Sequence, residues 1–353
     1  MISILASAIT SLIICFMIMP VIIKYSLKKN IVDIPGDRKV HNKLTPSMGG
    51  ISIYIAFIIA SLIWTEISLW SQLRIVLVAL TLVFFIGVRD DLVPLQPITK
   101  IIGQILAAII VIVVYDIRLK SFYGLAGIYD IPQWFGIIIS IFTIVVITNA
   151  FNLIDGLDGL AGTVGSLALL FFGSWFYLTG DFVFAILSFS LFGALIGFLI
   201  FNWEPSRVFM GDTGTMITGM MLSISSIHFI DSNFNLPNDH PFRMNTSVSA
   251  AVAVLIIPLV DTMRVFIVRI VRRQSPFKAD KNHIHHALIR LGLSHSKTSL
   301  LLGGTQFAFI GLVILLKDFN DNYLLAGIIV LAVILSLSLD HWVQKQSEKQ
   351  SAI

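Results

Sequence analysis

Eleven apolar runs dominate the sequence, and each is about as long as a helix needs to cross the ~30 Å hydrocarbon core of a bilayer. They lie near residues 1–23, 49–63, 75–88, 101–115, 134–148, 160–178, 182–201, 216–230, 248–268, 300–316 and 323–339. Because lipid offers no partner to a free backbone N–H or C=O group, such segments cross a membrane as helices. Only 12% of the residues are charged, against about a quarter in a soluble domain. We therefore expect an all-α polytopic membrane protein with about eleven transmembrane helices.

The basic residues predict how these helices are oriented. If the N-terminus lies outside and the C-terminus is cytoplasmic, 19 of the 24 Lys and Arg residues fall on the inner side and five on the outer side. The first run carries no charge before Lys24, so it lacks the basic segment that opens a signal peptide and is predicted to be the first span. The net charge of +4 thus indicates orientation and gives no support to nucleic-acid binding.

No internal repeat, low-complexity segment or long linker divides the sequence, so we expect a single membrane domain over residues 1–353. Cys15 is the only cysteine, which excludes a disulfide framework and a thiolate metal site within one chain. The polar clusters of the sequence all fall in loops predicted to be cytoplasmic, which lie near residues 24–48, 89–100, 149–160, 202–213 and 269–298.

The most polar of these clusters lies in residues 149–162, between two apolar runs. A carboxylate near the lipid core costs at least ~2.5 kcal/mol, so such residues usually line a wet or protein-walled cavity. Asn152, Asp155 and Asp158 recur every three residues and would share one side of a helix. We predict a polar site at the end of a membrane helix; the alternative is a capping loop whose side chains bond their own backbone.

Two further clusters carry carboxylates at the ends of spans. Asp90 and Asp91 are adjacent, and they repel unless a cation or a proton is shared; alternatively, one of them pairs with Arg89 or Lys100. Asp212 precedes the run near 216–230, where capping of that helix is the alternative to a functional role.

The inner end of the ninth span carries Asp261 and Arg264, which lie three residues apart. This spacing places them on one helix face, so we predict a structural ion pair rather than a catalytic role.

Three histidines, His283, His285 and His286, follow in the longest inner loop. Zinc is disfavoured because no cysteine and no second histidine pair lies nearby, so we expect the imidazoles to donate hydrogen bonds to phosphate oxygens.

The combined set of charges predicts a chemistry. Five carboxylates at the inner face would repel a phosphate, but Mg²⁺ held by Asp and Asn oxygens keeps positions open for substrate phosphates. The site therefore predicts phosphoryl transfer between a cytosolic nucleotide substrate and a lipid acceptor. A cation-coupled membrane transporter is the alternative of another class, but it would place charges near the midplane and within a repeat.

Five motifs follow one another along the sequence: Arg89-Asp90-Asp91, Asn149 to Leu160, Phe209-Met-Gly-Asp212, Pro258-Leu-Val-Asp-Thr-Met-Arg-Val265 and His283-Ile-His-His286. In these motifs and their order, the sequence resembles the polyprenyl-phosphate N-acetylhexosamine-1-phosphate transferases. The resemblance implies transfer of a sugar-1-phosphate from a UDP-sugar to undecaprenyl phosphate with release of UMP. It also implies a requirement for Mg²⁺ or Mn²⁺.

The same resemblance implies roles for individual residues. Asp212 would be a metal ligand, joined by Asn152, and Asp90 and Asp91 would be the catalytic carboxylates that serve the lipid phosphate or the metal. The substrate-binding residues would be Asp155, Asp158, Phe209, Lys43, His283, His285 and His286.

The histidine motif separates two branches of this family. Ile284 interrupts the run of histidines, which looks like the branch that uses UDP-GlcNAc and unlike the branch that uses UDP-MurNAc-pentapeptide. The resemblance therefore implies a bacterial protein of the inner membrane, with a cytoplasmic active site, that starts a cell-envelope polysaccharide. UDP-MurNAc-pentapeptide or another UDP-hexosamine remains the alternative donor, and the oligomeric state, with a homodimer among the options, is not fixed by the sequence.

Overall fold

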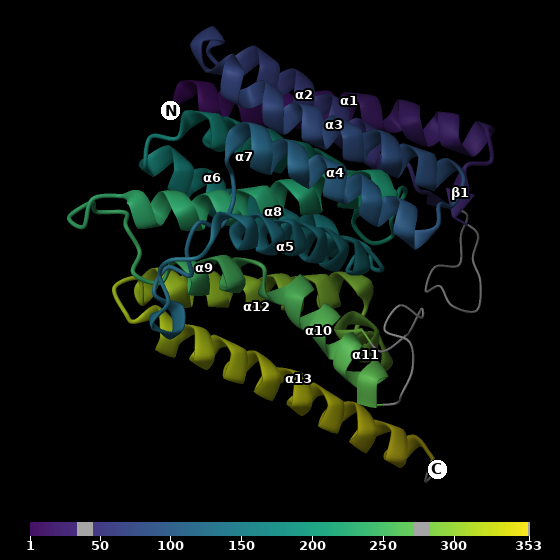
Figure 1. Cartoon of the computed structure of the whole chain (residues 1–353). Coiled ribbons are helices and arrows are strands. Elements are labelled where there is room, and N and C mark those ends of the chain that lie inside the picture. The colour runs from purple at the N-terminus through teal and green to yellow at the C-terminus, as the bar shows by residue number, and fades with distance from the viewer. Residues whose placement is uncertain (34–44, 272–282, 352–353) are drawn as a thin grey trace.

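The structure is a computed structural model that describes residues 1–33, 45–271 and 283–351, and almost all of its regular elements are helices (Figure 1). In chain order the helices are α1 (Ile2–Lys28), α2 (Gly49–Trp64), α3 (Trp70–Leu92), α4 (Pro97–Tyr115), α5 (Gln133–Leu153), α6 (Leu160–Leu178), α7 (Phe182–Asn202), α8 (Gly211–Asn235), α9 (Ser247–Val254), α10 (Ile256–Val271), α11 (Ile284–Arg290), α12 (His295–Leu315) and α13 (Asp321–Ser351). Two short antiparallel strands, β1 (Val32–Asp33) and β2 (Thr45–Pro46), join α1 to α2.

The helices account for every apolar run of the sequence. Nine helices of the described segments are long and apolar enough to cross a membrane, and α9 with α10 forms a bent pair that is either a broken span or a re-entrant loop. Helix α2 is also apolar but has only 16 residues. The expectation of an all-α, multi-pass membrane protein is thereby confirmed, while the number of crossings and the side of each terminus stay predictions.

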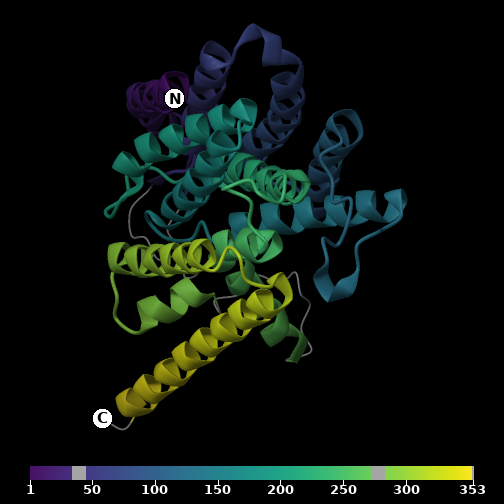
Figure 2. The same ribbon diagram turned by 90° about the vertical axis from the view of Figure 1, so that its left-hand side faces the viewer.

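Helix α8 lies inside the bundle, against α2, α3, α5, α6 and α7 (Figures 1 and 2). Of its most apolar 18-residue window, 94% is buried, although the helix carries many serines and threonines. Several of these hydroxyls bond to the helix itself: Ser223 Oγ donates to the carbonyl of Met220, and Ser226 Oγ to that of Leu222. Small side chains that satisfy their own polar atoms allow neighbouring helices to approach α8 closely.

The ninth apolar run was expected to be one continuous span, but it is broken into α9 and α10 with a bend of 76°. Pro258 has no N–H group, so the carbonyl of Val254 loses the donor that a continuous helix would provide. Gln306 of α12 replaces it, because its Nε2 donates to the carbonyl of Val254 at 2.7 Å and also to that of Val164 at 3.0 Å. The break is therefore paired within the protein, as non-helical backbone at membrane depth must be.

Helix α13 lies at the edge of the molecule in both views (Figures 1 and 2). Only 17% of its most apolar window is buried. Asp321 at its start accepts hydrogen bonds from the backbone N–H groups of Val248 and Ser249, at the beginning of α9. Farther along, Asp340 pairs with Arg264 of α10. These polar contacts attach α13 to the broken helix pair.

Candidate active site

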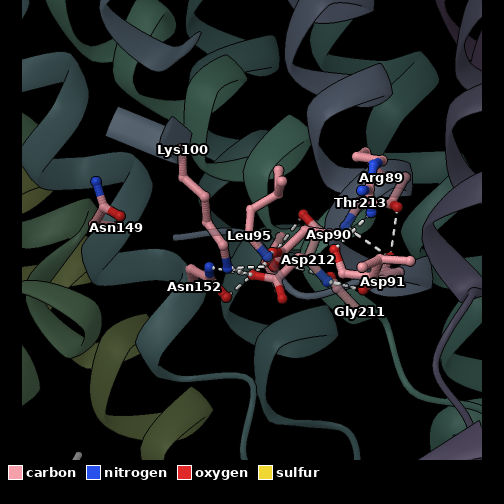
Figure 3. A network of polar contacts seen from close by, with 12 residues as sticks. Arg89, Asp90, Asp91, Leu95, Lys100, Asn149, Asn152, Gly211, Asp212 and Thr213 are labelled. Atoms are coloured by element: carbon pink, nitrogen blue, oxygen red, sulfur yellow. Dashed lines mark hydrogen bonds and ion pairs between the residues drawn. The ribbon is translucent and has the colours of Figure 1, made fainter. Parts of the chain in front are cut away.

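Three of the polar clusters, those that contain Asp90, Asn152 and Asp212, meet where four helix ends converge, and Figure 3 shows their side chains in contact. Helices α3 and α5 end there, and α4 and α8 begin there, so Asp91, Lys100, Asn152 and Asp212 come within hydrogen-bond distance of one another or of a shared neighbour. The predicted polar site at the end of a membrane helix is present, since α5 ends at Leu153, directly after Asn152.

Asp91 caps the N-terminus of α8 from another helix. Its Oδ1 accepts from the backbone N–H of Asp212 at 2.8 Å, and its Oδ2 accepts from the N–H and the hydroxyl of Thr213 at 3.0 and 2.5 Å. The first N–H groups of a helix have no partner within the helix and attract negative charge. Asp212 itself lies in the first turn of α8 and does not cap it, so the capping alternative for Asp212 is wrong.

Gly211 makes this arrangement sterically feasible. Its φ of +72° lies in the left-handed region, and a Cβ atom there would lie 2.0 Å from the carbonyl oxygen of Ser47 and 2.8 Å from Asp91 Oδ2. A side chain at this position would therefore strain the backbone and displace the carboxylate that caps α8.

Lys100 joins two of the carboxylates. Its Nζ contacts Asp90 Oδ2 and lies 3.0 Å from Asp212 Oδ1. Asp90 is buried, and its Oδ1 accepts from the N–H of Leu95 at 2.6 Å. Of the two pairing alternatives for the Asp90-Asp91 motif, the structure thus shows the one with Lys100, while Arg89 donates to the carbonyl of Val93.

From the sequence, Lys100 was predicted only as a possible partner of Asp90 or Asp91 and not as a site residue. Its position as the one basic residue in the first turn of an otherwise apolar helix was the available signal.

Asn152 contacts the same oxygen of Asp212 as Lys100 does. Its Nδ2 donates to Asp212 Oδ1 at 2.7 Å, and its Oδ1 accepts from the hydroxyl of Thr215 at 3.1 Å. The side chain of Asp212 nevertheless keeps 28% of its surface exposed, against 5% for Asp90. Asp212 is therefore the more accessible carboxylate of the pair.

Asp155 faces the same cluster from the loop after α5. Burial and the negative charges of Asp212 and Asp91 raise its pKa to about 7, although the N–H of Gly211 acts in the opposite direction. Burial is the larger cause, and the repulsion from Asp212 and Asp91 shows that these carboxylates lie close to one another. Hard oxygen donors gathered in this way fit a divalent cation such as Mg²⁺.

Asp158 does not point toward the cluster that contains Asn152 and Asp212. The chain leaves the helix after Leu153, so the three-residue spacing does not align the three side chains as it would in a continuous helix. Instead, Asp158 Oδ2 accepts from the N–H of Ser206 at 3.2 Å and lies 3.4 Å from His295 Nδ1. Burial alone would raise its pKa, but the contacts with His295 and Ser206 outweigh it and hold the pKa below its usual value.

The histidine motif is organised by Asp261. Its Oδ2 lies 2.8 Å from His283 Nδ1 and 3.5 Å from His285 Nδ1, and all three side chains are buried. Arg264 pairs with Asp340 instead, so the predicted ion pair between Asp261 and Arg264 is wrong. The error has a physical reason: the i, i+3 spacing brings two side chains near each other, but it does not exclude a better partner on another helix.

His286 differs from the other two histidines because it is half-buried. Burial and the neighbouring His285 and His283 lower its pKa to about 4. His286 is therefore neutral near pH 7 and can either accept or donate a hydrogen bond.

The structure says less about the last two predicted substrate-binding residues. Phe209 is half-buried in the loop between α7 and α8, where its N–H donates to the carbonyl of Pro46. Lys43 lies outside the described residues.

The fold and the site define a polytopic membrane protein with an oxygen-rich, charged centre at one end of its helical bundle. The sequence model of glycosyl transferase family 4 matches residues 73–230, from α3 to α8. A protein of Bacillus subtilis (strain 168), named "Probable undecaprenyl-phosphate N-acetylglucosaminyl 1-phosphate transferase", is 31% identical over 324 residues, which cover 90% of this chain and 86% of that protein.

Two other relatives carry related names. The "Decaprenyl-phosphate N-acetylglucosaminephosphotransferase" of Mycolicibacterium smegmatis is 32% identical over 76% of this chain and 71% of its own length. The "Undecaprenyl-phosphate alpha-N-acetylglucosaminyl 1-phosphate transferase" of Yersinia pestis is 27% identical over 88% of this chain and 84% of its own length. The chain belongs to glycosyl transferase family 4.

Proposed function

We propose that this protein transfers GlcNAc-1-phosphate from UDP-GlcNAc to undecaprenyl phosphate, giving undecaprenyl-diphosphate-GlcNAc and UMP. The observation that carries the proposal is the convergence of Asp90, Lys100, Asp155 and Asp212 at one end of an apolar helical bundle. Such a site can meet a water-soluble diphosphate and the phosphate of a membrane lipid at the same boundary. The names of the relatives describe the same sugar and a polyprenyl phosphate.

The reaction is a direct displacement at phosphorus. An oxygen of the lipid phosphate attacks the phosphorus atom that bears the sugar, the new P–O–P bond forms, and the bond to the bridging oxygen of UMP breaks. The electron pair of that bond leaves with UMP. A lipid phosphate has a second pKa of about 6 and is largely ionised near pH 7, so the step does not require a general base.

Asp212 is the proposed ligand of Mg²⁺, or of Mn²⁺ in its place. When bound, the cation would neutralise charge on the diphosphate. Asn152 is the second residue proposed at the metal; with its Nδ2 bonded to Asp212 and its Oδ1 to Thr215, it also fixes the direction of that carboxylate. Asp91 acts one step away, because it anchors the start of α8 and with it Asp212.

Lys100 and Asp90 are proposed to meet the lipid phosphate. The ammonium group of Lys100 lies between the carboxylates of Asp90 and Asp212, which hold it in place. A preorganised positive charge of this kind stabilises the charge that develops on a transferring phosphoryl group. A covalent aspartyl-phosphate is the alternative route. Trapping a phosphosugar adduct on the protein in the absence of lipid acceptor would contradict direct displacement.

The donor would lie between the loop after α5 and the histidine motif. Asp155 and Asp158 belong to that loop, and Phe209 enters from the loop before α8. His283, His285 and His286 would contact the diphosphate or the sugar, and Lys43 would contribute from the first basic loop.

This function places the protein in a bacterial cytoplasmic membrane, with the site on the cytoplasmic face, as the distribution of Lys and Arg predicts. UDP-MurNAc-pentapeptide and other UDP-hexosamines are the alternative donors. A cation-coupled transporter is the alternative of another class, but the carboxylates gather at helix ends rather than midway along the helices.

The test uses purified protein in detergent micelles with undecaprenyl phosphate, Mg²⁺ and radiolabelled UDP-GlcNAc or UDP-MurNAc-pentapeptide. We expect labelled lipid and UMP from UDP-GlcNAc alone, no product with EDTA, and a loss of at least about 10³-fold in rate in Asp212→Ala. A transporter would release no UMP.

Asp231→Ala is the matched control. Asp231 lies near the other end of α8 and, like Asp212, pairs with a lysine, because Lys120 Nζ lies 2.9 Å from its Oδ2. We expect nearly unchanged transfer in this variant. Equal losses in the two variants would indicate that Asp212 acts only through the stability of α8.

A further inference from the structure

Asp261 uses both of its oxygens to hold the histidine motif. Its Oδ1 accepts from the backbone N–H of Ile284 at 2.5 Å, at the start of α11, and its Oδ2 faces the Nδ1 atoms of His283 and His285. The residue leaves only 2% of its surface exposed. A buried carboxylate must be compensated by hydrogen bonds or positive charge, so these contacts are also what makes its burial tolerable.

The two imidazoles are thereby turned in a defined direction. When Nδ1 faces the carboxylate, Nε2 points away from it, and the rings of His283 and His285 are nearly parallel, with an interplanar angle of 16° and 5.2 Å between their centroids. His285 Nε2 lies against Gly156: a Cβ atom added there would be only 2.9 Å from it. The free nitrogen of His285 therefore reaches the loop that carries Asp155.

In this geometry the two nitrogens of each ring have different partners: Nδ1 faces Asp261, and Nε2 is left for another group. A histidine whose Nδ1 is bonded to a carboxylate keeps Nε2, on the other side of the ring, for a second hydrogen bond. Phosphate oxygens are acceptors that an Nε2–H group would bind.

We propose that Asp261 is a positioning residue that orients His283 and His285 so that their Nε2 atoms bind the diphosphate of the nucleotide donor. This inference rests on the proposed function, because it assigns the diphosphate to the same site.

A metal ion is the competing use of these side chains. In the described part of the chain, Asp261, His283 and His285 form the one cluster of three histidine, cysteine or carboxylate side chains whose ligand atoms all lie within 4.8 Å of one another. However, two ligand atoms on a tetrahedral ion at ~2.0–2.1 Å are roughly 3.3 Å apart, whereas Asp261 Oδ2 and His283 Nδ1 are separated by 2.8 Å. That distance is a hydrogen bond, and the second oxygen of Asp261 is already bonded to a backbone N–H.

The test is a double-mutant cycle on the full-length protein, with Asp261→Asn, the double variant His283→Ala/His285→Ala, and the triple variant. We expect Asp261→Asn to raise the KM for UDP-GlcNAc and lower kcat/KM by about 10–100-fold, with the KM for the lipid unchanged. If Asp261 acts through the histidines, the triple variant equals the double variant, because the effects of coupled residues are not additive. Additive losses would overturn the proposal.

Asp321→Asn is the matched control, since Asp321 is also a buried carboxylate that accepts backbone N–H groups at the start of a helix, here α9. We expect it to lower the melting temperature while leaving both KM values unchanged. A rise in the KM for UDP-GlcNAc in this variant as large as in Asp261→Asn would show that any lost cap has the same effect, and would overturn the positioning role.

Gly156→Ala approaches the same ring from the other side. Because its Cβ would press on His285 Nε2, we expect a raised KM for UDP-GlcNAc in an otherwise folded protein. An unchanged KM in this variant would show that the ring does not reach the donor.

Two measurements separate this proposal from the proposed function. Nitrogen-15 NMR of histidine-labelled protein reports the Nδ1 hydrogen bonds without any reaction, and we expect Asp261→Asn to change the His283 and His285 signals. Binding of UDP alone should weaken in the same variant even if no sugar is transferred to lipid. Unchanged histidine signals would overturn the positioning role, and so would about one bound zinc ion per chain that is lost in Asp261→Asn. If the signals change and UDP binding weakens but no sugar is transferred to lipid, the result counts against the transferase function only.

Discussion

Helices α8 and α13 show opposite relations between composition and burial. In its most apolar window, helix α8 is less apolar than helix α13 because it carries serines and threonines, yet 94% of that window is buried. Helix α13 is strongly apolar between its start and Asp340, yet only 17% of its window is buried. In a soluble protein this order would be reversed.

The difference follows from the solvent. Lipid chains are as apolar as leucine side chains, so an apolar surface gains little by leaving the lipid and entering the protein. Polar and small side chains gain partners and close packing inside the bundle. The buried helix is therefore the one that can carry a charged site at its end, and the exposed helix is held by a few polar contacts such as those of Asp321 and Asp340.

The largest loss of stability is expected from a substitution at the start of the buried helix α8. Asp91→Ala would leave the N–H groups of Asp212 and Thr213 and the hydroxyl of Thr213 without their acceptor. We expect a loss of about 3–5 kcal/mol in the free energy of unfolding, because unpaired buried donors cost about 1–3 kcal/mol each. Transfer activity should fall as well, because Asp212 loses its anchor. Thermal unfolding in detergent, together with the transfer assay, checks both, and a stable variant with full activity would show that α8 does not need this cap.

The next largest difference is expected when an apolar side chain is truncated, because the cost in stability should be large on α8 and small on α13. Met220 of α8 is 0% exposed and Leu337 of α13 is 63% exposed. We expect Met220→Ala to cost about 3 kcal/mol, because the side chain leaves a cavity. Leu337→Ala should stay within about 0.5 kcal/mol, because lipid or detergent fills the space. Equal losses, measured by thermal unfolding of the two variants, would contradict the assignment of α13 to the lipid boundary.

The smallest difference in stability is expected when the same enlargement, serine to leucine, is made on each helix. Ser223 on α8 is completely buried, whereas Ser338 on α13 is exposed. Ser223→Leu should cost about 1–3 kcal/mol through overpacking, and Ser338→Leu should be neutral or slightly favourable in lipid. The unfolding temperatures of the two variants in nanodiscs provide the measurement. A neutral Ser223→Leu would mean that the packing around α8 is looser than its burial indicates.

The positions of the helices followed closely from the sequence, because the need to pair backbone groups in lipid leaves few alternatives to an apolar helix. The prediction of one continuous span near 248–268 was wrong, because the helix bends before Pro258. Gln306 of α12 supplies the donor that the bend leaves missing. A proline within an apolar run signals that a carbonyl loses its donor, but not whether the helix bends or which residue replaces the bond.

The convergence of several polar clusters was predicted more reliably than the individual contacts within them. Asp90, Asp155 and Asp212 do converge, as the common inner location of their loops predicted. The pairing of Asp261 with Arg264 was wrong, and the alignment of Asp158 with Asn152 failed because α5 ends between them. Local spacing is informative only while the chain stays helical and no distant group competes.

The sequence by itself determined that this chain is an all-α membrane protein whose polar residues gather at the ends of its apolar helices, because the cost of charge in lipid depends on composition alone. Only the tertiary structure decided which ends meet. Asp91 caps α8 across 121 residues of sequence, and Lys100 reaches Asp212 across 112. Such contacts depend on how whole helices pack, and each forms only after the helices that carry the two groups have taken their places.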